Sequence, residues 1–212
     1  MTREVPKATR DRDRAAKVAE QDYRAALSIA RQIEDPWFRC QALSFAARHC
    51  PDTSTKSEIL SEAFQAAEAL SEPNRRVSVA SWPVGVLAAS DMEEQLAAKV
   101  ENLLVEISQE PSPVRRGDAL SLLLGALRRA PRKHFLKVLG LFADACLSPL
   151  RNGKRNKKGE SRLAYWLPEI WEVSAAEVER LAQEIQGPVL RTRALRGIEK
   201  ARGANKGVDP TR

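Results

Sequence analysis

The segment RNGKRNKKGES, residues 151–161, holds five basic side chains and one acidic side chain, interspersed with two glycines and two asparagines. These turn-forming residues predict an exposed, flexible loop. Its cations suit a phosphate backbone, and Tyr165 and Trp166 follow closely enough to stack on a base. The alternative is a solvated loop that aids solubility, with both aromatic side chains in the core. The five cations are Arg151, Lys154, Arg155, Lys157 and Lys158.

Four further arginines each stand three residues after a proline. They are Arg39, Arg76, Arg116 and Arg191. Guanidinium groups form bidentate contacts with phosphate and carboxylate, so a row of them in register would bind a phosphate backbone or an acidic peptide. In the alternative, each arginine pairs with an acidic residue or a helix C-terminus of its own or the neighbouring repeat.

One tryptophan, Trp37, directly follows one of these prolines, and an exposed tryptophan in a turn is a common interface anchor. Two more arginines, Arg162 and Arg193, lie close to the basic segment and to the last proline. The full set predicted to bind a partner protein or nucleic acid is Arg151, Lys154, Arg155, Lys157, Lys158, Arg162, Trp37, Arg39, Arg76, Arg116, Arg191 and Arg193.

Residues suited to catalysis or metal binding are sparse. The only histidines are His49 and His134, and no nucleophile elbow or glycine-rich phosphate loop is present. The three cysteines lack CxxC spacing, and Cys40 and Cys50 are too far apart on one helix to share an ion. We therefore expect no enzymatic activity, no metal and no cofactor. The one enzymatic alternative is a helical-repeat DNA glycosylase, which works in a solenoid groove.

The elements that position these residues are predicted by an internal repeat. The anchors Pro36, Pro73, Pro113 and Pro188 are 37, 40 and 75 residues apart, which corresponds to a period of about 37–38 residues with one unit skipped. Pro149 stands where the skipped anchor is expected, and the basic segment displaces the arginine and alanine that follow it. Proline is favoured at the first position of a helix, so each anchor predicts a helix start.

Apolar residues follow each anchor at helical spacing, above all at the sixth and seventh positions after the proline. A second amphipathic helix precedes each anchor, at 12–34, 55–71, 91–109, 131–147 and 175–186. Thr55, Ser90 and Ser174 each precede a glutamate by three residues, as in a capping box. Two further prolines, Pro83 and Pro168, fall inside the anchored helices, where they should kink or end them.

The fold class predicted from these patterns is all-α, an α-solenoid of about five stacked antiparallel helical hairpins. Its unit has an acidic-proline turn, then an arginine, then Ala-Leu, and resembles a HEAT-type repeat. The resemblance is clearest at Glu110, Pro111, Val114, Arg115, Ala119 and Leu120. In the other units the arginine comes one or two residues earlier relative to the turn. The resemblance covers residues 12–202, between tails at 1–11 and 203–212 that we expect to be flexible, and implies a binding or scaffolding surface.

Charge is distributed unevenly along the chain. Residues 1–24, 25–110 and 111–212 carry net charges of +2, −6 and +11. No run of apolar residues reaches the roughly 20 needed to cross a bilayer, so we expect a cytoplasmic protein with no membrane contact. We predict a scaffold subunit that binds another protein with an acidic surface and is a monomer outside its complex. The alternative is a module of the same fold that binds DNA or RNA through its basic C-terminal half.

Overall fold

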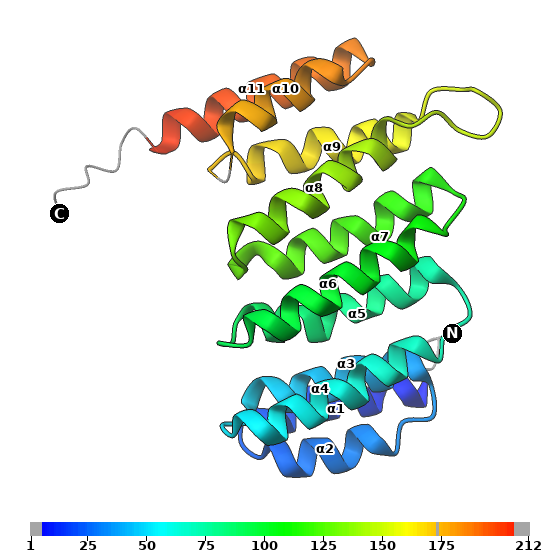
Figure 1. Ribbon diagram of the computed structural model, residues 1–212, viewed down its shortest axis with the longest axis vertical. Helices are drawn as coiled ribbons and strands as arrows, with labels where there is room; N and C mark the ends of the chain where they lie inside the picture. The colour runs from blue at the N-terminus through cyan, green and yellow to red at the C-terminus, as the bar shows by residue number, and fades with distance from the viewer. Residues whose placement is uncertain (1–5, 173, 206–212) are drawn as a thin grey trace, which may run out of the picture. The chain divides into compact units, whose positions relative to one another are not determined.

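The computed structural model describes residues 6–172 and 174–205, which form helices and no β-strand. Figure 1 labels the α-helices. In chain order the helices are α1 (Lys7–Ala19), α2 (Tyr23–Arg31), α3 (Pro36–His49), α4 (Thr53–Glu68), α5 (Pro73–Ala88), α6 (Glu93–Ser108), α7 (Pro113–Ala126), the 3-10 turn η1 (Leu127–Arg129), α8 (Arg132–Leu147), α9 (Lys157–Glu169), α10 (Ala175–Glu184) and α11 (Pro188–Asn205). The all-α prediction is confirmed.

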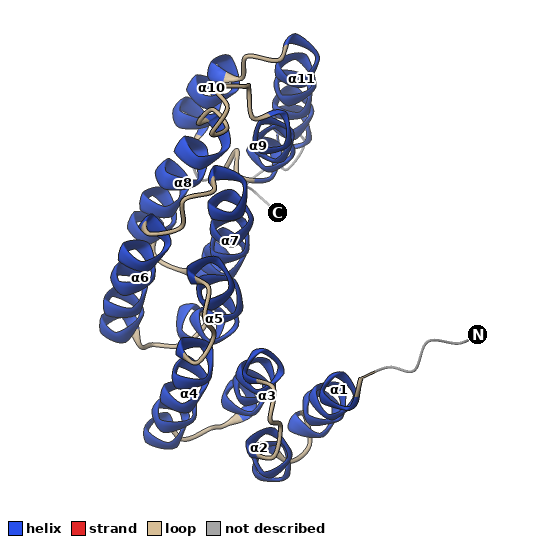
Figure 2. Cartoon of the chain, turned by 90° about the vertical axis from the view of Figure 1, so that its right-hand side faces the viewer, coloured by secondary structure: helices blue, strands red, loops and turns tan. Residues whose placement is uncertain are grey.

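The chain forms two compact units. The first consists of Met1–Glu110 with Asp118–Val138, and the second of Pro111–Gly117 with Leu139–Arg212. In the first unit α3 packs against α1, α2, α4 and α5, and α5 packs against α4 and α6. Figure 2 shows α4 and α6 on one side of this unit and α3 and α5 on the other. In the second unit α11 packs against α9 and α10.

The proline anchors begin helices as predicted. Pro36, Pro73, Pro113 and Pro188 are the first residues of α3, α5, α7 and α11. In front of α3, the carboxylate of Asp35 caps the helix by accepting hydrogen bonds from the backbone N–H groups of Trp37 and Phe38. The sixth and seventh residues after each anchor are buried except Leu195, which is half-buried. The repeat thus sets both the helix starts and the buried stripe.

Pro149 does not begin a helix, which corrects the prediction for the fourth unit. It lies in a loop, and α9 begins eight residues later at Lys157. Within that loop the N–H of Leu150 bonds to the carbonyl of Lys154, and Gly153 has a φ of +73°. Glycine adopts this left-handed conformation without steric cost, so a compact turn takes the place of the expected helix start.

The predicted helix at 12–34 is two helices. Asp22 ends the continuity, because its carboxylate accepts hydrogen bonds from the N–H groups of Arg24 and Ala25 and caps α2. The predicted tail at 1–11 is helical from Lys7, since α1 packs against α3 through buried Ala15 and Ala19. At the other end the predicted tail at 203–212 is helical up to Asn205. The rest of both tails lies outside the described residues.

None of the three predicted capping boxes forms its side-chain bond. Asp52 caps α4 in place of Thr55, and its carboxylate accepts a bond from the N–H of Thr55 itself. The side-chain hydroxyl and the backbone N–H of Thr55 both stabilise the carboxylate and lower the pKa of Asp52. Ser90 does not cap α6, because its hydroxyl donates to the carbonyl of Val86. Ser174 occupies the N-cap position of α10 without a side-chain bond to the helix.

Pro83 lies inside α5, which continues to Ala88. A proline has no N–H, so the carbonyl of Val79, four residues earlier, lacks its helical donor. The buried thiol of Cys40 on α3 lies 3.5 Å from this carbonyl and donates to it. Burial raises the pKa of Cys40, which keeps the thiol protonated and able to donate. Pro168 lies at the end of α9, which stops one residue later.

Candidate functional site

Two of the four repeated arginines bind backbone carbonyls within their own repeat. Arg76 donates from Nη1 to the carbonyls of Leu70 and Ser71, at 2.8 and 3.1 Å, just after α4 ends. Arg191 donates from Nε to the carbonyl of Ile185 at 2.8 Å, just after α10 ends. In both units the arginine binds a carbonyl six residues before it. These carbonyls lack helical partners, so the structural interpretation holds for both arginines.

The other members of this set differ in setting. Arg39 is half-buried and lines a small depression together with the ion pair of Arg31 and Glu62. Arg116 is half-buried at the start of α7. Trp37 is half-buried, and the guanidinium of Arg75 lies 5.7 Å from its ring centroid in a cation–π contact. None of these three side chains is fully exposed to solvent.

The basic segment 151–161 is only partly a loop. Its first part forms the turn before α9, and Lys157 begins the helix. Arg155 forms an ion pair with Glu160, whose side chain is 2 % exposed. Arg162 is half-buried, and desolvation lowers its pKa. Arg151, Lys154, Lys157 and Lys158 are exposed, as is Arg193 on α11.

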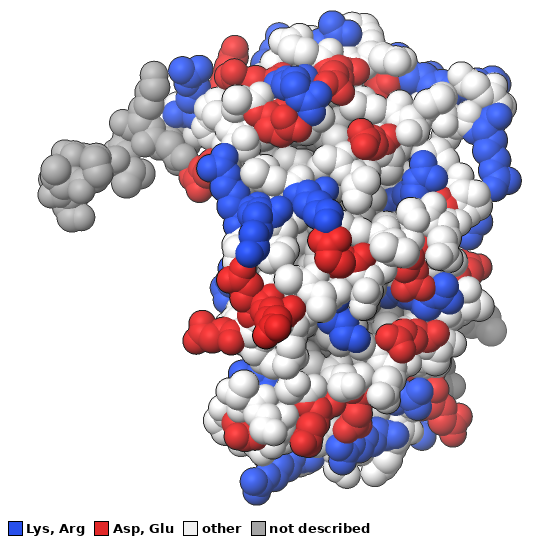
Figure 3. Space-filling model, viewed as in Figure 1, with Lys and Arg blue, Asp and Glu red and all other residues white. Residues whose placement is uncertain are grey.

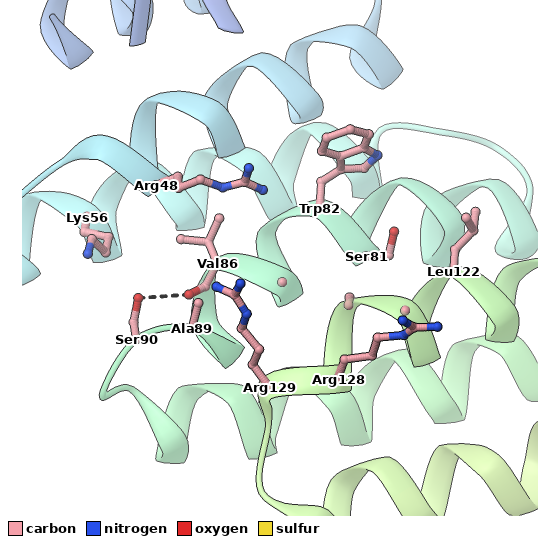
Figure 4. A pocket seen from close by; sticks show the side chains of 13 residues that line it. Arg48, Lys56, Ser81, Trp82, Val86, Ala89, Ser90, Leu122, Arg128 and Arg129 are labelled. Carbon is pink, nitrogen blue, oxygen red and sulfur yellow. Dashed lines mark hydrogen bonds between the residues drawn. The ribbon is translucent and has the colours of Figure 1, made fainter. Parts of the chain in front are cut away.

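The first unit contains a basic groove that the sequence analysis did not predict. It encloses about 690 Å³ and is lined by residues of α3, α4, α5, α7 and η1. Four of its lining side chains are cationic and none is acidic. Figure 4 shows Arg48 and Arg129 pointing toward the space around Val86, whereas Arg128 lies nearer Leu122. We call this site the basic groove, and its cations are Arg48, Lys56, Arg128 and Arg129.

Helix ends position the cations of the basic groove. Arg48 is in the last turn of α3, where its guanidinium also lies 5.7 Å from the ring centroid of Phe45. Lys56 is in the first turn of α4. Arg128 and Arg129 form the end of η1 and are exposed. A concave site whose lining carries several cations and no carboxylate attracts anions, because its walls have a net positive charge.

The floor of the basic groove is apolar. Trp82 and Val86 come from α5, and Leu122 comes from α7 with half of its surface exposed. The ring of Trp82 packs edge-on against Phe45 at 5.2 Å, which fixes its orientation. Where Gly85 of α5 faces Ala126 of α7, a Cβ on the glycine would lie 3.7 Å from the Ala126 Cβ. The groove thus offers apolar contact beside cationic side chains.

Sequence reasoning missed this groove because its residues come from four separate stretches of the chain. The available signal was the pair Arg128–Arg129 directly after the leucine-rich run of α7. No group of three or more His, Cys, Asp or Glu residues is arranged to hold a metal ion within residues 6–172 and 174–205. In the same part of the chain, every helix is too short or too polar to cross a membrane.

Comparison of the chain with models of known protein families, with curated proteins and with solved structures gave no match.

Proposed function

We propose that the protein is a non-enzymatic helical-repeat scaffold that binds an acidic segment of a partner protein in the basic groove. The observation that carries this proposal is the combination of four cations, no carboxylate and the exposed leucine Leu122 in one concavity. The resemblance of the repeat to HEAT units supports it, because such repeats present extended binding surfaces. The groove is lined mainly by the anchored helices α3, α5 and α7, which the repeat places next to one another.

A peptide fits the basic groove better than a nucleic acid does. Leu122, half of whose surface is exposed, offers aliphatic surface, which suits an apolar side chain flanked by carboxylates. Trp82 is packed against Phe45 and is less available for stacking on a base. The polar lining consists of cations and two serines, so it holds no carboxylate or imidazole to act as a general base. We accordingly propose binding without catalysis at this groove.

The direct test is fluorescence anisotropy with a labelled peptide of repeated Asp-Glu-Leu triplets, and with the same peptide carrying Ala for Leu. Double charge reversal, Arg128→Glu with Arg129→Glu, should raise the Kd for either peptide by at least about tenfold, which is about 1.4 kcal/mol. Leu122→Ala should weaken binding of the leucine peptide and leave the alanine peptide unchanged. These two effects separate the cations from the apolar floor.

The matched control is Arg14→Glu with Lys17→Glu, two exposed cations on α1 away from the groove. Thermal unfolding followed by circular dichroism shows whether each variant is folded, and Lys56→Glu, which reverses a third cation of the groove, should weaken binding in the same direction. An equal loss of affinity in the α1 control and in the groove variant would mean that the peptide responds only to net charge. That result would disprove the groove as the binding site.

A further inference from the structure

A second basic surface lies on the other unit, at the turn before α9 and on the exposed face of that helix. It carries four exposed cations and one exposed tyrosine, whose side chain is 64 % exposed. We call it the α9 basic face, and its residues are Arg151, Lys154, Lys157, Lys158 and Tyr165. None of these residues lines the basic groove of the first unit.

The base of this surface is held by buried polar contacts. Asn156 accepts a bond from the N–H of Gly159 at 2.9 Å and donates to the carbonyl of Ala145 at 3.2 Å. Glu160 accepts from the N–H of Gly187 at 3.0 Å and pairs with Arg155 at 3.4 Å. These bonds tie the turn to α8 and to the start of α11. The turn is therefore anchored, which reduces the entropy lost when a ligand binds.

Close packing at Gly159 fixes the same region. A Cβ at this position would lie 2.4 Å from the carbonyl oxygen of Cys146, closer than any real contact. The backbone of α9 therefore approaches the end of α8 as closely as glycine allows.

The first turn of α9 carries two positive charges, which are unfavourable at a helix N-terminus. Lys157 and Lys158 occupy its first turn, where the partial positive charge of the helix end repels cations. Glu160 is the only acidic residue of the segment 151–161, and it is buried against Arg155. The positive end of the helix dipole therefore disfavours both lysines. A bound polyanion would offset the unfavourable charge.

Tyr165 lies two turns beyond Lys158 on the same face of α9, with exposed Ser161 between them. Its neighbour Trp166 packs edge-on against Phe142, with the ring centroids 6.3 Å apart. The two aromatic side chains that the sequence placed near the basic segment thus have different settings. Only the tyrosine ring is offered to solvent beside the cations.

We propose that the α9 basic face binds single-stranded nucleic acid. Arg151, Lys154, Lys157 and Lys158 contact successive phosphates, and Tyr165 stacks on an unpaired base. An exposed ring on a convex helix face reaches a base only where that base is unstacked from its own strand, so single strands bind better than duplexes. This binding is separate from the peptide binding proposed for the basic groove.

The test is anisotropy of fluorescein-labelled oligo-dT and oligo-U, about 15 nucleotides long, titrated with the full chain from about 50 mM salt upward. Replacing Arg151, Lys154, Lys157 and Lys158 with Ala should weaken binding and lower the slope of log K against log salt by up to about 3, since each single-strand phosphate contact contributes about 0.7. Tyr165→Ala should weaken binding by about tenfold at constant slope, whereas Tyr165→Phe should leave it unchanged.

The matched control removes four exposed cations elsewhere, with Ala at Arg14, Lys17, Arg196 and Lys200. This control should lower the slope of log K against log salt by less than the α9 variant does. In the groove variant Arg128→Glu with Arg129→Glu, adding Tyr165→Ala should weaken binding by the same factor as in the unchanged protein. No binding of either oligonucleotide at about 50 mM salt would overturn the proposal. The proposal would also be overturned if a duplex and poly-glutamate bound as tightly as the single strands and Tyr165→Ala had no effect. The face would then attract anions without recognising a strand.

Discussion

Arg76 and Arg191, the recurring arginines of two units, show how a charged residue becomes structural. Each follows its anchor proline by three residues, and its side chain reaches back across the turn to a carbonyl just after the preceding helix ends. Arg76 adds an ion pair with Glu106 on α6 to this bond. The position that looked suited to an extended anion therefore satisfies backbone carbonyls within the repeat.

Arg191 and Arg193 provide a test of this role on one helix. Arg191→Met keeps the aliphatic stem but removes the bond to the carbonyl of Ile185, so the free energy of unfolding should fall by about 1–2 kcal/mol. Arg193 is exposed, and Arg193→Met should change the free energy by less than about 0.5 kcal/mol. Urea unfolding measures both values. Equal effects of the two substitutions would remove the structural role of the repeated arginine.

The thiol of Cys40 and the ring of Pro83 form a pair that a double-mutant cycle can separate. Cys40→Ala should destabilise the native protein by about 1–3 kcal/mol, because the carbonyl of Val79 loses its donor in a buried site. In a Pro83→Ala background the new N–H can bond to this carbonyl, so the same cysteine substitution should cost less. Urea unfolding of the four proteins gives the coupling free energy. A coupling of zero would mean that the thiol contributes packing alone.

At the scale of elements, helix contacts are set by small residues. Gly197 on α11 faces Pro168 on α9, where a Cβ on the glycine would lie 2.5 Å from Cγ of the proline. Alanines play the same part in the first unit, since Ala26, Ala30, Ala63, Ala66 and Ala67 are all buried. Close approach compensates for a chain with few aromatic residues, because small side chains allow backbones to pack directly.

Glycine-to-alanine substitutions on two helices should have opposite signs. Gly197→Ala should lower the melting temperature, since the contact with Pro168 outweighs the better helix propensity of alanine. Gly140 lies inside α8, and a Cβ added there would meet nothing within 4 Å, so Gly140→Ala should raise the free energy of unfolding by about 0.5–1 kcal/mol. Thermal unfolding by circular dichroism checks both. Stabilisation of both variants would show that α9 and α11 are not in close contact.

At the scale of the whole molecule, opposite charges form ion pairs between α2 and α4 and between α6 and α8. Arg31 of α2 pairs with Glu62 of α4, and Glu93 and Glu101 of α6 pair with Lys133 and Lys137 of α8. Figure 3 shows acidic and basic side chains interleaved over the face that it draws. The net charges of −6 and +11 calculated for residues 25–110 and 111–212 are therefore partly neutralised within the chain.

Because many charges are paired within the chain, we expect only weak electrostatic attraction between two copies of the protein. We predict a monomer at about 150 mM salt, where charges interact over only about 8 Å, and concentration-dependent association at low salt. Size-exclusion chromatography with light scattering at several protein concentrations measures the mass. One fixed oligomer that persists from about 20 to 500 mM salt would indicate an apolar interface in place of electrostatic attraction.

The sequence by itself determined the features that depend on a few neighbouring residues. The anchored helix starts at Pro36, Pro73, Pro113 and Pro188 follow from proline's missing N–H, and the buried stripe follows from helical periodicity. Local residue types did not identify the residue that caps a helix at Asp22 and Asp52. Nor could it show that a turn would replace the helix expected at Pro149.

Only the tertiary structure decided which charged residues face solvent and which are used in folding. Arg155 and Arg191 look like their exposed neighbours in the sequence, yet one neutralises buried Glu160 and the other binds the carbonyl of Ile185. The basic groove joins residues as far apart as Arg48 and Arg129, which approach because α3, α5 and α7 pack in succession. A pattern along the chain records residue types and their spacing. Whether a charged side chain is buried, and which side chains it meets, depends on contacts between helices that are many residues apart in the sequence. Only folding sets those contacts.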